Sequence, residues 1–172
     1  MTWNKIIWNQ FGAAIDMLDD AIQACPDALW QARLYNEREV QPEFAEFWYL
    51  AYHALFWLDF YLSETAVNFA PPAPFNLSEL EAGLLPERVF TKDELLGYLG
   101  YGRTKCQNRI EATTDFTAPQ RVRTDWPEMS IGEMLLYNMR HVQEHAAQLS
   151  LFLGQQAVLT SGWISKAKKD QK

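Results

Sequence analysis

The chain contains three histidines, and two of them stand four residues apart in the stretch RHVQEHAAQLSLFLGQ, residues 140–155. If this stretch is helical, His141 and His145 share one face with their side chains about 5–6 Å apart. Two imidazoles at that spacing can bind one divalent ion, with nitrogen–metal distances of about 2.0–2.1 Å. The third histidine, His53, lies in a separate aromatic segment and is the candidate for a third ligand.

The residues between the two histidines narrow the chemistry. A zinc peptidase helix of the HExxH type carries its general base directly after the first histidine, whereas here Val142 follows His141. Peptidase chemistry is therefore disfavoured. Histidines at this spacing also occur as hydrogen-bonded core residues, and spacing alone leaves that alternative open. A shared ion would satisfy one nitrogen of each ring, which matters because a buried neutral imidazole has both a donor and an acceptor to satisfy.

Four segments carry the signals of long helices that would position these histidines. Apolar residues recur at i, i+3 and i+4 in the first, and Pro42 suits the first turn of the second. Capping boxes, TKDE at 91–94 and SIGE at 130–133, open the third and fourth. The predicted helices span residues 3–24, about 42–68, 91–113 and 130–155.

The connection between the second and third helices is long and rich in proline. The cluster PPAP at 71–74 cannot continue a helix, and one short helical possibility remains at Leu77–Ala82. We therefore predict an all-α fold, a four-helix bundle with a long crossover between helices 2 and 3, and such bundles build metal sites from facing helices. The bundle is expected to span residues 1–157. Residues 158–172 are expected to form a C-terminal tail. Its lysine cluster is expected to be a solvated, frayed terminus without function and consists of Lys166, Lys168, Lys169 and Lys172.

Composition limits the classes of partner. The chain has 172 residues, 48% of them hydrophobic, which suits one compact domain. A net charge of −7 disfavours binding to nucleic acid or to anionic lipid. No segment approaches the roughly 18 charge-free apolar residues of a membrane span. Cys25 and Cys106 are isolated in sequence and predict free thiols, so the expected location is the cytoplasm.

His53, the pattern His141–xxx–His145–xx–Gln148–Leu149 and the opening residues 130–133 together resemble the DinB/YfiT-like bundle proteins. The resemblance covers nearly the whole chain. It implies an up-down-down-up bundle in which His53, His141 and His145 hold a divalent ion. Characterised relatives include thiol transferases that use low-molecular-weight thiols and a thiol-dependent isomerase. The dimers common among relatives, together with the high aromatic content, predict a homodimer.

Three neutral nitrogen ligands leave an open coordination position, which is typical of a catalytic site. The expected function is a thiol-dependent S-transferase acting on a small-molecule electrophile. The ion is expected to be zinc or nickel, with iron as a further candidate. A metal-dependent hydrolase and a non-enzymatic bundle with a structural or empty site are the alternatives. Pocket candidates are Tyr49, Trp57 and Asn138, with Glu46 as a weaker candidate for supporting the ligands; no catalytic residue is assigned.

Overall fold

The computed structural model describes residues 1–36, 41–160 and 162–168, and within these ranges the chain is predominantly helical. The long helices are α1 (Trp3–Ala24), α2 (Phe47–Tyr61), α3 (Lys92–Ala112) and α4 (Ile131–Gln155). Three short 3₁₀ helices lie between them, η1 (Asp27–Leu29), η2 (Pro42–Ala45) and η3 (Ser78–Leu80). A two-residue antiparallel ladder joins β1 (Pro119–Gln120) to β2 (Met129–Ser130) just before α4. The expected all-α class is confirmed.

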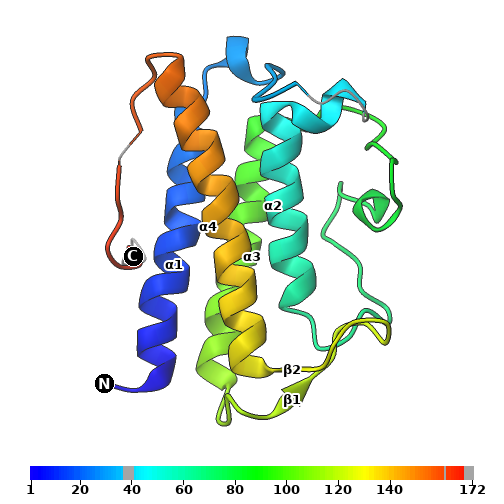
Figure 1. The fold of residues 1–172 in the computed structure, drawn as a ribbon, viewed down its shortest axis with the longest axis vertical. Coiled ribbons are helices and arrows are strands. Elements are labelled where there is room, and N and C mark those ends of the chain that lie inside the picture. The colour runs from blue at the N-terminus through cyan, green and yellow to red at the C-terminus, as the bar shows by residue number, and fades with distance from the viewer. Residues whose placement is uncertain (37–40, 161, 169–172) are drawn as a thin grey trace.

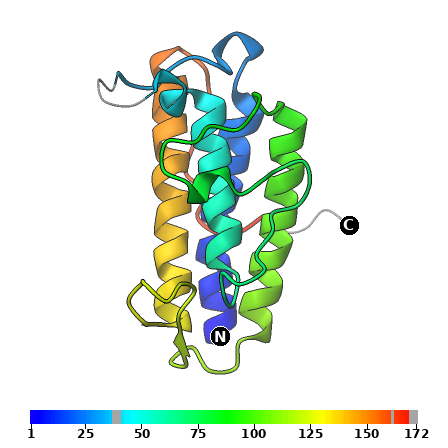
Figure 2. The same cartoon turned by 90° about the vertical axis from the view of Figure 1, so that its right-hand side faces the viewer.

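The four long helices pack side by side, with α1 and α2 each contacting both α3 and α4 (Figure 1). Residues 62–91 separate α2 from α3, and Figure 2 shows this segment passing along the outside of α2. Because the segment covers α2 there, this helix is buried on almost every side, including Ala51, Tyr52, Phe56 and Phe60 at 0% exposure. None of the described helices is long and apolar enough to cross a membrane.

The predicted starts of the third and fourth helices are confirmed in detail. The Thr91 side chain accepts from the Glu94 amide, and the Glu94 carboxylate accepts from the Thr91 amide at 2.8 Å. Ser130 and Glu133 make the same reciprocal pair at the start of α4. Each capping box satisfies two amides that the first turn of a helix otherwise leaves unpaired.

The second helix is shorter than expected, because it begins at Phe47 and ends at Tyr61 rather than spanning about 42–68. Pro42 instead opens η2. At the far end the Asp59 carbonyl accepts from the Lys105 Nζ at 3.0 Å and from the Ser63 hydroxyl at 3.2 Å. Side chains thus bond a carbonyl of the last turn, where a helix leaves such groups without an intrahelical amide partner.

The C-terminal segment packs on the bundle. The Lys168 amide donates to the buried Asp16 carboxylate at 2.5 Å, and the Lys168 Nζ donates to Asp20 at 2.6 Å. The Lys168 carbonyl accepts from Arg103 at 2.9 Å, while the Ala167 amide donates to the Asn9 carbonyl at 2.8 Å. The expectation of a solvated, frayed terminus is therefore wrong for residues 167–168. Lys169 and Lys172 lie outside the described residues.

Candidate metal centre

The three histidines meet in space although they come from two helices. The Nε2 atom of His141 lies 3.3 Å from that of His53 and 3.1 Å from that of His145. One ligand atom from each ring lies within 4.8 Å of both others. Nitrogens about 2.1 Å from a tetrahedral ion are themselves roughly 3.4 Å apart. The spacing of the three rings therefore fits one shared divalent ion.

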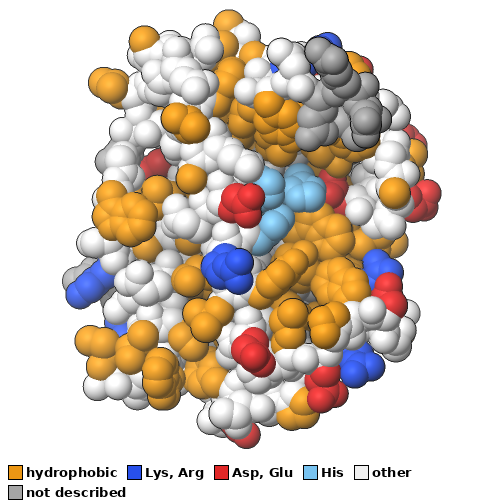
Figure 3. Space-filling view, in the orientation of Figure 1, with side chains coloured by type: hydrophobic (Ala, Val, Ile, Leu, Met, Phe, Trp, Pro, Cys, Tyr) orange, Lys and Arg blue, Asp and Glu red, His pale blue; other side chains and the backbone are white. Residues whose placement is uncertain are grey.

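The histidine cluster is reachable from outside. The His53 side chain is 28% exposed, and the other two rings are half-buried. Figure 3 shows the histidines together at the surface, with hydrophobic side chains beneath them and an acidic and a basic side chain at their border. A small molecule can thus reach the histidine side chains from solvent, and a catalytic metal site needs such an open position.

Glu79, which the sequence interpretation did not identify, holds His53 in position. Its carboxylate is 4% exposed and lies 2.7 Å from His53 Nδ1. It also accepts from the Trp57 indole at 2.9 Å and from the Tyr49 hydroxyl. When Nδ1 carries the proton and donates a hydrogen bond to Glu79, the Nε2 lone pair of His53 is free to face the shared centre. Burial alone would raise the pKa of Glu79, but hydrogen bonds from His53, Tyr49 and Trp57 outweigh it and lower that pKa.

The two histidines of α4 differ in their support. His145 Nδ1 lies 2.9 Å from the Gln148 side-chain oxygen one turn later, which fixes the ring with Nε2 toward the centre. His141 Nδ1 is buried and has no hydrogen-bond partner among the described residues. Burial, reinforced by the neighbouring histidines, lowers the pKa of His141 to about 3 and that of His145 to about 4. Both rings are therefore neutral near pH 7, the form that binds a metal ion.

A cavity of about 330 Å³ lies beside the histidines and reaches His53 and His145. Two expected pocket residues, Tyr49 and Trp57, line it together with Tyr35, Phe44 and Glu81. Part of its wall is thus aromatic, and the polar atoms of Tyr49 and Trp57 are already directed to Glu79. This arrangement offers an apolar surface for a small substrate next to the ligand nitrogens.

Asn138 and Glu46 occupy other positions. Asn138 is 1% exposed and its amide donates to the Leu58 carbonyl at 3.0 Å, so it is a core residue with a backbone partner. The Glu46 carboxylate accepts from the Trp48 indole at 2.6 Å. The residue that supports His53 is instead Glu79 in η3, and the only sequence signal for it is the short helical possibility at Leu77–Ala82.

Comparison with known proteins identifies one family. The family model described as the DinB superfamily matches residues 10–149, a range that contains all three histidines and most of the chain. No curated protein matches the sequence.

Proposed function

This chain belongs to the DinB superfamily, and on that premise we propose that it is a metal-dependent S-transferase. In this proposal His53, His141 and His145 hold one divalent ion, zinc or nickel, and the site joins a small thiol to a small electrophile. The observation that carries the proposal is the convergence of three Nε2 atoms, two pairs of which are 3.1–3.3 Å apart, at a face open to solvent.

A divalent ion at this site supplies a Lewis acid that lowers the pKa of a coordinated thiol or water. The protein's own groups prepare the ligands for the ion. Glu79 orients His53, Gln148 orients His145, and burial keeps the rings of His141 and His145 neutral. The thiol loses its proton to solvent, and its sulfur forms a bond to the electrophilic carbon. The leaving group departs with its electron pair. Tyr49 and Trp57 present an apolar wall that excludes water from one side of this exchange.

The choice of a thiol over water rests on the likeness to DinB/YfiT-like proteins, whose characterised members include thiol transferases. The open face also suits hydrolysis by a metal-bound hydroxide, and this is the alternative activity. A reducing compartment is part of the proposal, supported by Cys25 and Cys106, which are both free and buried.

The test combines substrates with two variants. Metal-loaded protein is assayed with a panel of low-molecular-weight thiols and a chromogenic electrophile, and separately with ester and amide substrates. We expect turnover that requires a thiol and is lost in His145→Ala. Gln155→Ala is the control, since it removes an exposed side chain from the same helix.

The competing functions give different results. Turnover without a thiol would identify a hydrolase. If chelation lowers the melting temperature strongly and no substrate is turned over, the ion is structural and the enzyme proposal fails.

A further inference from the structure

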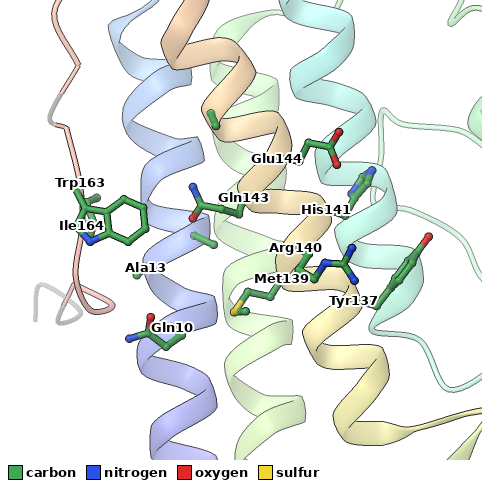
Figure 4. Close-up of a pocket in the computed structure, with 12 residues that line it drawn as sticks. Gln10, Ala13, Tyr137, Met139, Arg140, His141, Gln143, Glu144, Trp163 and Ile164 are labelled. Atoms are coloured by element: carbon green, nitrogen blue, oxygen red, sulfur yellow. The ribbon is translucent and has the colours of Figure 1, made fainter.

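Two charged side chains flank His141 on the outer face of α4. Arg140 and Glu144 are both exposed, and together with His141 they line a groove of about 670 Å³. In Figure 4 the Arg140 guanidinium lies toward Tyr137, and the His141 ring is drawn between it and the Glu144 carboxylate. A molecule that reaches the histidines therefore meets a cation on one side and an anion on the other.

The positive charge of Arg140 is not neutralised within the described part of the chain. No carboxylate of those residues forms an ion pair with it, and that includes Glu144 one turn later. Other arginines do pair with carboxylates: Arg88 with Glu94, Arg103 with Asp16, Arg109 with Glu64, Arg121 with Glu128 and Arg123 with Asp125. In a protein with a net charge of −7, an arginine beside the site that keeps its donors available is a ready anion receptor.

We propose that Arg140 is an anion-binding residue of the site and holds a carboxylate of the thiol substrate while the sulfur lies at the three histidines. This inference rests on the proposed S-transferase function and narrows its thiol to one that carries a carboxylate. A guanidinium suits the role because its planar fork can donate two parallel hydrogen bonds to one carboxylate. Arg140 and His141 line the same groove, so the two groups can act on one small molecule.

The general field of the site is a rival explanation. A divalent ion and the Glu79 carboxylate leave one net positive charge, which would attract any anion, and Glu144 opposes that attraction. Substitutions at Arg140 and Glu144 separate the two explanations, since each removes one charge at a similar place. Loss of a specific contact at Arg140 weakens the binding of carboxylate-bearing thiols alone. Loss of the negative charge of Glu144 acts in the opposite direction, because it strengthens the attraction of the site for any anion.

The experiment uses the full-length protein loaded with cobalt, whose visible absorption changes when a thiolate binds. Wild type, Arg140→Gln and Glu144→Gln are titrated with 3-mercaptopropionate and with neutral 2-mercaptoethanol. We expect Arg140→Gln to weaken the binding of 3-mercaptopropionate about tenfold or more, because a hydrogen bond to a charged group is lost. The affinity for 2-mercaptoethanol should not change, and Glu144→Gln should not weaken either thiol. Helical circular dichroism confirms that each variant is folded.

Two outcomes would overturn the assignment: unchanged binding of 3-mercaptopropionate by Arg140→Gln, or an equal loss for both thiols. If no thiol perturbs the cobalt spectrum of the wild type, the proposed thiol chemistry fails, and calorimetry with succinate then tests Arg140 separately. Succinate binding that is weaker in Arg140→Gln would still support the anion site, and binding that is equal in both proteins, or absent from the wild type, would overturn it.

Discussion

The Glu79 carboxylate lies 2.7 Å from His53 Nδ1, although the two residues are 26 positions apart and only His53 belongs to a long helix. Glu79 is carried by η3 in the segment 62–91, so that connection contributes directly to the candidate metal centre. The segment therefore has two roles: it covers α2, and it fixes the orientation of the one histidine that α2 supplies.

Replacing Glu79 by glutamine should weaken metal binding while leaving the bundle folded. The carboxylate accepts from three donors, on His53, Trp57 and Tyr49, whereas an amide has one oxygen and brings donors of its own. Loss of such support typically lowers metal affinity about 10–100-fold. Competition with a chromophoric chelator measures the affinity, and Glu87→Gln, an exposed change in the same segment, is the control. Equal affinities in wild type and Glu79→Gln would contradict the role of Glu79.

The metal-free protein should lose stability as the pH falls below about 6.5, the pKa of histidine in an unfolded chain. His141 and His145 have folded-state pKa values lowered to about 3 and about 4, chiefly by burial. Between these values and 6.5 the unfolded state binds more protons, so protonation favours unfolding and stability declines with decreasing pH.

Melting temperatures measured with a chelator from pH 7.5 to pH 4 test this dependence. His141→Asn should show a shallower decline than the wild type over the same range, because it removes one of the two titrating rings. Carboxylates titrate in both proteins, so their contribution to the pH dependence of the melting temperature cancels in the comparison. Identical slopes would show that burial of His141 does not depress its protonation.

Substitution of Gly12 should release the C-terminal segment from α1. A methyl group at Gly12 would lie 2.5 Å from the Ala167 side chain, closer than any normal contact. Gly12→Ala should therefore increase proteolysis near residues 163–168, and the fluorescence of Trp163 should change. The matched control is Gly97→Ala in α3, where an added methyl meets nothing within 4 Å. Protection from proteolysis that is equal in the two variants would mean that the segment does not pack on Gly12 in solution.

Self-association remains a prediction, and one surface suits it. Trp3, Ile6 and Leu136 are 68%, 38% and 48% exposed and border one apolar groove of about 590 Å³ along α1 and α4. Light scattering at micromolar concentration should give the mass of a dimer, and Leu136→Glu should shift it to that of a monomer, because a charge would be buried in the interface. A monomeric wild type would remove the homodimer from the account.

The helices and the histidines were predictable because their signals are local. Capping boxes at Thr91 and Ser130 mark helix starts by residues three apart, and the spacing of His141 and His145 places both rings on one face. Glu79 was not predictable in the same way, since it lies in a proline-rich connection and acquires its role from contacts with α2. The last turn of α2 is likewise bonded by a distant residue, Lys105.

The packing of the C-terminal segment escaped prediction for a related reason. Lysines near a chain end usually are solvated, and the carboxylates that bind Lys168, those of Asp16 and Asp20, are about 150 residues earlier in the chain.

Asn138 shows the limit of helical periodicity. It does lie on the inner face of α4, but whether such an amide meets a cavity or a carbonyl is decided by the neighbouring helix, here by Leu58.

X-ray absorption at the zinc edge, with protein loaded with one equivalent of zinc, shows whether His53, His141 and His145 bind one ion together. If the three histidines share the ion, the coordination shell should contain three imidazole nitrogens at about 2.0–2.1 Å together with one or more oxygen ligands from solvent. In His53→Ala the number of imidazoles should fall by one. A wild-type shell with two or fewer imidazoles, or a shell unchanged in His53→Ala, would contradict the claim.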